Sequence, residues 1–94
     1  MAAIGVVTLE IVLQNSHSLK DKRHVVKSLK DRLRAKFNVS VAEIDYQDQW
    51  QHAMVAAVTV SSDRGFAEKV LQSIEEEAAM LLGSELARTT VEWL

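Results

Sequence analysis

The stretch SLKDKRHVVKSLKDRLRAKF, residues 18–37, has the pattern of a long amphipathic helix. At about 100° per residue, its apolar side chains fall within one arc of the helical wheel: Leu19, Val26, Leu29, Leu33 and Phe37. Ser18 is a favourable N-cap residue, and Asp21 completes an approximate capping box with a carboxylate near the positive helix end. Asn38 fits the C-terminal cap. We therefore expect a helix from about residue 19 to residue 37.

Strand-like segments lie on both sides of this helix. Residues 4–13 are mostly β-branched or aliphatic and alternate between two faces, one of which carries Val7, Leu9 and Ile11. Residues 39–46 and 52–60 give two further strands joined by a short polar connection, and residues 86–94 give the last strand.

A second helix is expected over residues 64–82, with Ser62 or Asp63 as its N-cap and Gly83 at its end. Five apolar residues form its expected buried face: Phe66, Val70, Ile74, Ala78 and Leu81. The glutamates at 75–77 are expected to point largely outward.

The order β-α-β-β-α-β predicts an α+β, ferredoxin-like βαββαβ fold, in which two helices cover one face of a four-stranded antiparallel sheet. No linker or repeat divides the chain, so residues 1–94 are expected to form a single domain. The other sheet face is then uncovered, and several apolar residues are assigned to it: Val6, Val12, Val55, Ala57 and either Trp93 or Leu94. Such a face favours self-association as a homo-oligomer, most simply a dimer, and shielding by loops is the alternative.

Composition excludes several classes of protein. The 94 residues are 48% hydrophobic and 26% charged, which is typical of a globular domain. There is no cysteine, so disulfide scaffolds, thiolate zinc sites and cysteine nucleophiles are excluded. No Walker loop or dinucleotide-binding glycine motif is present, and no cofactor is expected. The chain begins without a signal-peptide pattern, and its longest apolar stretch falls short of the ~20 residues that cross a membrane. We expect a cytoplasmic protein.

The net charge of −2 hides a strong asymmetry along the chain. Residues 20–36 hold eight basic and two acidic side chains, whereas residues 37–94 hold three basic and ten acidic ones. Five of the basic residues follow one another at spacings of 3, 4, 3 and 4, along one edge of the first helix beside its apolar arc. This set, which we term the basic ladder, consists of Lys20, Arg23, Lys27, Lys30 and Arg34.

Repulsion between neighbouring like charges in the ladder costs about 0.2–0.5 kcal/mol per pair, which a helix of mixed sign would avoid. The functional interpretation is a surface that follows the phosphates of structured RNA. The alternative is a solvated helix face whose lysine and arginine stems cover apolar surface. Lys22 joins the candidate RNA contacts, although it projects toward the apolar arc, where it would snorkel or pair with a sheet carboxylate such as Glu10.

RNA-binding domains of this topology usually stack bases on aromatic residues of the central strands. Residues 4–13 and 53–60 contain no aromatic residue, and the chain has no Gly-x-x-Gly loop. If RNA binds, the first helix must therefore contact it through charge and shape rather than through base readout.

Other candidate residues lie near the expected hairpin. Glu43, Asp45 and Asp48 cluster with His52 and could ligate a hard cation, but such residues more often solvate a hairpin, and no metal site is predicted. Glu43, Asp48 and Trp50 are candidate partner contacts, with packing on the sheet edge as the alternative for Trp50. His17 lies between two serines with no acid to orient it, so no catalytic residue is assigned.

Three segments resemble the bacterial YlxP-like family, a small domain family of unknown function: residues 18–23, residues 37–43, and residues 45–51 with Asp45, Gln47, Asp48, Trp50 and Gln51. The resemblance implies a ferredoxin-like fold and a gene neighbourhood of translation and ribosome-maturation genes, near initiation factor 2 and ribosome-binding factor A. It carries over no catalytic residue. The matching positions where a site is expected are Lys20, Lys22, Arg23, Asn38, Ser40, Glu43, Asp48 and Trp50.

The leading hypothesis is therefore a non-enzymatic accessory protein that contacts structured RNA or the ribosome through its first helix. The alternative is a homo-oligomeric protein-interaction module. A third hypothesis is an enzyme acting on a small phosphorylated ligand, which would require a pocket shared by Lys22, Arg23, Glu43, Asp48 and His52.

Overall fold

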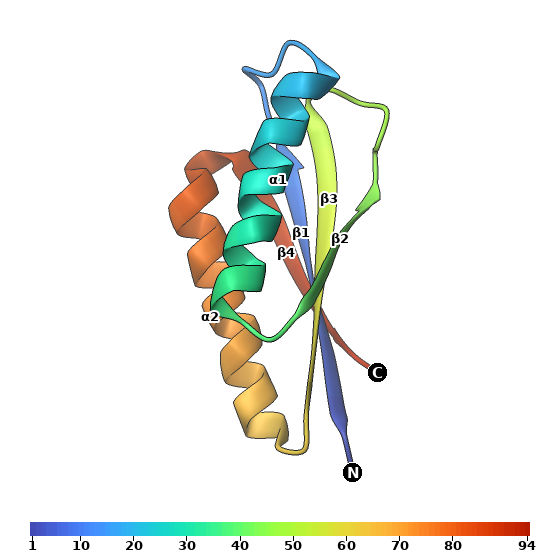
Figure 1. The fold of residues 1–94 in the computed structure, drawn as a ribbon, viewed down its shortest axis with the longest axis vertical. Helices are drawn as coiled ribbons and strands as arrows, with labels where there is room; N and C mark the ends of the chain where they lie inside the picture. Colours follow the sequence, from blue (N-terminus) through green and yellow to red (C-terminus); the bar gives the residue numbers. More distant parts are fainter.

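The computed structural model describes residues 1–94 and has two helices packed on one face of a four-stranded antiparallel sheet (Figure 1). The elements follow one another as β1 (Ala3–Val12), α1 (Leu19–Lys36), β2 (Ser40–Asp45), β3 (His52–Ser61), α2 (Arg64–Leu82), the short 3-10 helix η1 (Gly83–Glu85) and β4 (Leu86–Trp93). The strand order β2-β3-β1-β4 places β3 and β1 at the centre and β2 and β4 at the edges. The ferredoxin-like prediction is confirmed.

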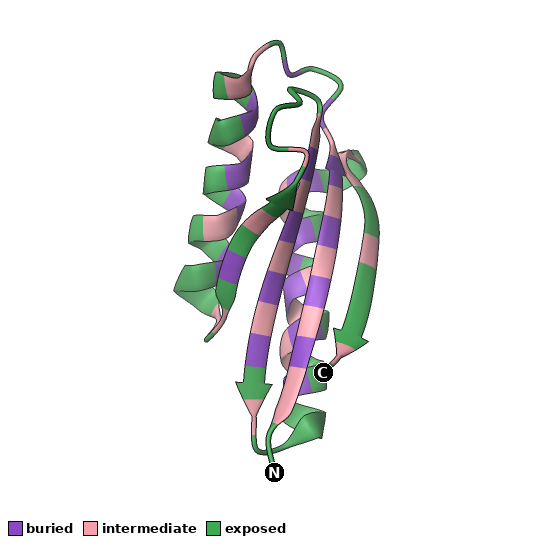
Figure 2. Cartoon of the chain, turned by 90° about the vertical axis from the view of Figure 1, so that its right-hand side faces the viewer, coloured by how far each residue is buried: buried purple, intermediate pink, exposed green.

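The hydrophobic core lies between the sheet and the helices. Alternation along β1 buries Val7, Leu9 and Ile11 completely, and Figure 2 shows the same alternation along both central strands. α1 packs on β2 and β3, whereas α2 packs on β1, β3 and β4. Val26, Leu29 and Leu33 of α1 complete the core on the β2 side, as the helical periodicity predicts.

Both ends of α1 follow the sequence prediction to within one residue, but the predicted C-terminal cap does not form. The Ser18 hydroxyl accepts a hydrogen bond from the Asp21 backbone N–H, and the Asp21 carboxylate accepts one from the N–H of His17, the residue before the N-cap, so a variant of the capping box is formed. Asn38 does not adopt the left-handed conformation, which among residues other than glycine is found at Tyr46 alone. The predicted Asn38 cap is wrong because the chain is already extended at Phe37 as it turns into β2.

The buried face of α2 is rotated from the expected one. Ile74 and Ala78 are buried as expected, and Val70 and Leu81 pack against the core, but Ala67 and Leu71 are buried whereas Phe66 is 59% exposed. The small side chain of Ala67 allows the helix to approach the sheet closely where the larger phenylalanine would not fit. Glu77 is also buried, against expectation, and it accepts ion pairs from Lys36 at 2.9 Å and Arg32 at 3.4 Å.

The prediction that Val55 and Ala57 of β3 lie on the open sheet face is wrong, because the two faces of this strand are exchanged relative to the prediction. Residues directly opposite each other in an antiparallel pair share a face, and Val55 pairs with Leu9 and Ala57 with Val7, so both are buried under the helices. The Trp93 ring also lies on the helix side, where Arg64 of α2 stacks over it at 4.2 Å. Val6 and Val12 lie on the open face, as predicted, because they alternate with the buried residues of β1.

Gly5 lies where β1 packs closely against Leu71 of α2 and the Trp93 ring of β4. A Cβ atom at this site would lie 2.7 Å from Leu71 Cδ1 and 2.9 Å from a ring carbon of Trp93. Gly65, in the first turn of α2, has only the Asp63 carboxylate oxygen within reach, at 3.4 Å.

We predict that Gly5→Ala lowers the free energy of unfolding by about 1–3 kcal/mol, because the added methyl group overpacks the contact between β1, α2 and Trp93. Gly65→Ala is the matched control and should change stability by no more than about 1 kcal/mol, in the stabilising direction. Urea denaturation of both variants measures the difference, and equal stabilities would show that Gly5 is not required by close packing.

Candidate functional site

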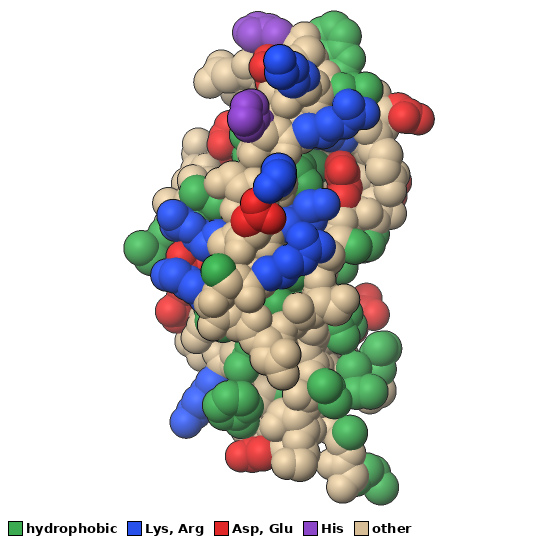
Figure 3. Space-filling model, in the orientation of Figure 1, with side chains coloured by type: hydrophobic (Ala, Val, Ile, Leu, Met, Phe, Trp, Pro, Cys, Tyr) green, Lys and Arg blue, Asp and Glu red, His purple; other side chains and the backbone are tan.

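The basic ladder follows one edge of an unbroken α1, on the side of the helix nearest β2. Lys20, Arg23, Lys27 and Arg34 are exposed, and Lys30 is half-buried. Figure 3 shows lysine and arginine side chains gathered over α1 on the surface turned toward the viewer. The predicted arrangement of the five side chains along a single water-facing edge is therefore present.

The ladder is only partly neutralised within the chain. Lys27 pairs with Asp31 at 2.6 Å, whereas Lys20, Arg23 and Lys30 make no ion pair. Arg34 donates a hydrogen bond from Nη2 to the Val41 carbonyl oxygen at 2.8 Å and keeps its charge unpaired.

The positive field of the ladder acts on the carboxylate that lies within it. The hydrogen bond from Lys27 holds the pKa of Asp31 below its usual value against an opposing effect of desolvation, and the charges of Lys27, Arg34 and Lys30 act in the same direction as the hydrogen bond. Asp31 therefore stays ionised to a lower pH than a free aspartate, and its pairing with Lys27 persists with it.

A shallow groove runs between the ladder and β2. Its walls are formed by the ladder residues from Arg23 to Arg34 together with Asp31, and its floor includes Val26 and Glu43. Four cations and two carboxylates line this groove, and Glu43 is already paired with Lys22 beneath it. The groove is therefore a net positive surface suited to an anion that lies along α1.

Lys22 does not belong to this surface, which corrects its assignment as an RNA contact. Its side chain is 1% exposed, and Nζ lies 2.9 Å from Glu43 Oε2. The same ammonium group donates to two backbone carbonyl oxygens of the β2–β3 connection, those of Tyr46 at 2.7 Å and Gln47 at 3.3 Å, and to that of His52 at the start of β3, at 3.2 Å. Pairing with a sheet carboxylate is confirmed, but the partner is Glu43 and not Glu10.

The position of α1 explains the choice of partner. α1 packs on β2 and β3, so Glu43 on β2 lies beneath Lys22, while Glu10 lies on the opposite face of the sheet. Glu10 instead bonds His52 Nε2 at 2.8 Å. Glu43 Oε2 is buried and makes no well-aligned hydrogen bond, so its contact with Lys22 is chiefly ionic.

The β2–β3 connection presents Trp50 to solvent. Trp50 is 53% exposed, which rules out the packed alternative on the sheet edge. It lines a shallow hollow with Asp48, Gln49 and Gln51, whereas Glu43 belongs to the ladder groove. The three candidate partner contacts therefore do not form one surface.

The connection is shaped by two features that no sequence pattern indicated. Tyr46 has a left-handed backbone with φ of 62°, and its ring stacks on His52 with centroids 3.8 Å apart. Lys22, which is distant in the sequence, bonds the backbone carbonyl oxygens of both residues, and no short sequence pattern marks this arrangement.

The residues of the third hypothesis do not share a pocket. Lys22 and Glu43 are paired with each other, His52 is bonded to Glu10, and Asp48 lies in the separate hollow beside Trp50. No group of three or more histidine, aspartate or glutamate side chains is placed to hold a metal ion. Neither helix has the length and apolar character that crossing a membrane requires.

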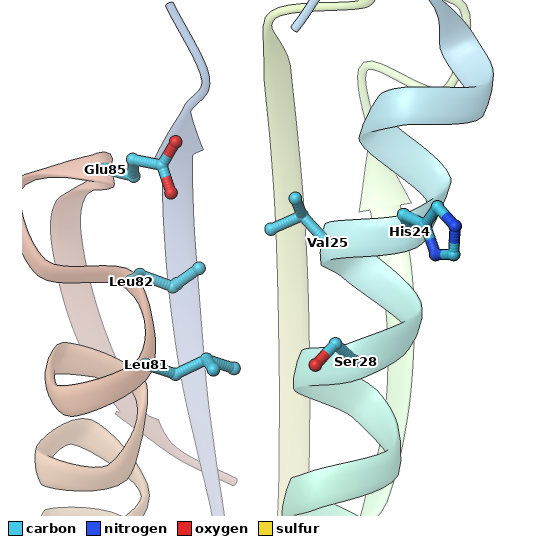
Figure 4. Close-up of a pocket in the computed structure, with 6 residues that line it drawn as sticks. All are labelled: His24, Val25, Ser28, Leu81, Leu82 and Glu85. Atoms are coloured by element: carbon cyan, nitrogen blue, oxygen red, sulfur yellow. The ribbon is translucent and has the colours of Figure 1, made fainter. Parts of the chain in front are cut away.

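A second groove lies between the two helices, where no motif in the sequence pointed to a site (Figure 4). Val25 of α1 lines it from one side and Leu81 and Leu82 of α2 from the other, while the His24 ring points away from α2. Ser28 and Glu85 also line the groove, but no pair of polar groups converges there on a common point. This groove lacks the geometry of a catalytic site.

Comparisons with known proteins identify relatives along nearly the whole chain. The family model described as "Protein of unknown function (DUF503)" matches residues 4–91. The uncharacterized protein YlxP of Bacillus subtilis (strain 168) is 39% identical over 90 residues, which cover 96% of this chain and 98% of YlxP.

Solved structures share the fold at low sequence identity. The de novo designed protein Foldit4 matches with a TM-score of 0.63 at 13% identity, covering 100% of this chain and 97% of the design. The designed protein LFR1 1, with a ferredoxin fold, matches with a TM-score of 0.52 at 14% identity, covering 100% and 84%. The dinuclear metal-binding M20-family peptidase YXEP of Bacillus subtilis gives 0.62 at 10% identity, covering 100% of this chain and 26% of the peptidase. At these identities the likeness shows the fold alone.

We predict that Lys22→Met lowers the free energy of unfolding by about 2–4 kcal/mol, because it leaves the Glu43 carboxylate and three carbonyl oxygens without their cation. Lys20→Met removes the same charge from the exposed edge of the same helix and should change stability by about 0.5 kcal/mol or less. Denaturant unfolding compares the two variants, and similar stabilities would show that the buried ammonium group does not hold the fold together.

Proposed function

This chain belongs to the DUF503 family of proteins of unknown function, and from that starting point we propose that it is a non-enzymatic accessory protein that contacts structured RNA through the basic ladder. The relationship to YlxP confirms the resemblance drawn from the sequence, but it assigns no activity. Ribosomal RNA is the first RNA to test, since the resemblance implies a neighbourhood of translation genes.

The observation that supports this proposal is the set of cations left without carboxylate partners. The chain has 13 acidic residues, and several of them neutralise cations elsewhere on α1. Glu77 forms ion pairs with both Arg32 and Lys36, and Glu43 forms an ion pair with Lys22. On the ladder only Lys27 is paired, so positive charge is concentrated at one edge of an otherwise acidic protein.

The length of the ladder suits a nucleic-acid backbone. From Lys20 to Arg34 the helix rises about 21 Å at 1.5 Å per residue. At the B-form rise of about 3.4 Å per nucleotide, this length corresponds to roughly six phosphates of one strand of a duplex. The rigid helix holds the backbone positions of the five residues at fixed spacing, so only their side chains need to be ordered on binding.

The same features indicate how RNA would be recognised. On the open face of β1 and β3 the only aromatic ring is that of His52, at the start of β3, and this ring is already stacked on Tyr46 and bonded to Glu10. Binding through α1 therefore depends on phosphate charge and on the shape of the RNA, with little dependence on base sequence.

We predict that replacing the three ladder cations that have no partner, as Lys20→Gln, Arg23→Gln and Lys30→Gln together, weakens binding of a fluorescent RNA hairpin and of purified ribosomes. Each cation that no longer neutralises a phosphate should reduce the slope of log K against log salt concentration by about 0.7–0.9. Fluorescence anisotropy across a salt series measures both the affinity and the slope.

The matched control removes three cations that lie off the ladder, as Lys36→Gln, Arg64→Gln and Lys69→Gln, and gives the same net charge. This control should retain most of the affinity and the original salt slope. Unchanged RNA binding by the ladder variant, or an equal loss in the control, would reject the ladder as the RNA surface. Retention of an acidic protein, in place of RNA, after nuclease treatment would assign the same ladder to a protein partner.

A further inference from the structure

We propose that the open face of the sheet binds the same face of a second copy of this chain, in a two-fold dimer whose axis runs across the strands through Thr8 and Thr90. This interface lies on the opposite side of the sheet from α1 and does not depend on the proposed RNA binding. In Figure 2 the open face is turned toward the viewer, with α2 behind it.

The open face is formed by the even-numbered residues of β1, β3 and β4. Its apolar side chains are concentrated on the two central strands and on β2, and several are well exposed: Ile44 is 49% and Val60 is 57% exposed. Leu94, whose N–H bonds the Ile4 carbonyl oxygen beside this face, is 79% exposed. No helix of the chain packs on this surface, and its exposed apolar side chains are therefore available to another chain.

The register gives the face a self-complementary pattern about its middle row. Thr8 lies between Ala56 on β3 and Thr90 on β4, and Ala42 on β2 continues this row of small side chains. Small residues in the middle row allow the two sheets to approach closely along the axis.

The same axis brings together the rows on either side of the middle row. One row contains Met54, Glu10 and Arg88, and the other contains Val58, Val6 and Glu92. A two-fold rotation about the middle row places Met54 over Val58 of the other copy and Arg88 over Glu92 of the other copy, while Glu10, which is held by His52, lies over Val6.

The charges of the face agree with this pairing. Glu10 is bonded to His52 within the chain, at 2.8 Å. Arg88 and Glu92 have no ion-pair partner within the chain, and both lie on the edge strand β4. Two such pairs at the rim would orient the copies, while the apolar centre supplies the buried surface.

The size of the face lies at the lower end of specific interfaces. Two strands of ten residues, one of eight and one of six, at about 3.3 Å per residue and about 4.8 Å apart, give a footprint of roughly 500–600 Å² per copy before side-chain relief is counted. This value approaches the lower limit of standard interfaces, which bury about 600 Å² per partner.

The test is sedimentation of the full chain over a range of concentrations. The wild-type protein should form a dimer, and Ala56→Arg, at the centre of the face, should leave it monomeric with its secondary structure intact by circular dichroism. Met54→Lys, on the neighbouring row, is a second variant with the same expected result if Ala56→Arg does not fold. The triple ladder variant is the matched control and should dimerise like the wild type.

Charge reversal tests the orientation. Arg88→Glu alone and Glu92→Arg alone should each raise the dimer dissociation constant at least tenfold, because each places like charges together, and the double reversal should restore it. A wild-type protein that stays monomeric at all concentrations would overturn the proposal. A dimer that survives both face variants but is lost on Thr89→Pro would overturn it in favour of pairing between β4 edges.

Discussion

The ammonium group of Lys22 is the group on which the arrangement of α1, β2 and their connection to β3 depends. A buried cation is costly unless opposite charge and hydrogen-bond acceptors surround it, and here one carboxylate and three carbonyl oxygens do so. The four oxygens come from β2, from the β2–β3 connection and from the start of β3. One side chain therefore fixes both the height of α1 above the edge strand and its rotation about its own axis. The ladder faces the groove beside β2 because Lys22, on the same helix, faces the sheet.

The elements themselves were predictable because their signals are local. Capping by Ser18 and Asp21, the apolar arc of α1 and the alternation along β1 each follow from neighbouring residues, and the structure contains all three. The errors arose where both faces of an element are apolar. β3 has apolar or small residues at almost every position, so its faces are defined by pairing with β1 and not by its own alternation. In α2, the predicted arc was correct at Ile74 and Ala78 but wrong at Phe66, because Ala67 and Leu71 face the sheet in its place.

The site was predictable only to the extent that it follows from helical spacing. The five ladder positions lie on one edge because of the 3.6-residue period, which holds for any helix. Which cations are neutralised depends on which strand each helix covers, and sequence spacing does not contain that information. Lys22 pairs with Glu43 because α1 packs on β2, and Lys36 pairs with Glu77 because α2 lies beside α1. The free charge of the ladder is thus a property of the tertiary structure, although its alignment is a property of the sequence.

The two proposed surfaces, although independent, constrain each other geometrically. A two-fold axis that runs across the strands places the β2 edge of one copy over the β2 edge of the other. The two ladders, each beside its own β2, would therefore lie on the same side of the dimer. Two sheets about 10 Å apart, each carrying a helix layer of similar thickness, separate the two α1 axes by roughly 30 Å. One RNA molecule gains affinity from binding both ladders only if it is rigid enough to span that distance. If it cannot reach both ladders at once, the second ladder adds nothing to the affinity. A short hairpin would meet a single ladder, whereas a large folded RNA would meet both. Dimerisation on this face would therefore favour extended, structured RNA without adding any contact to a base.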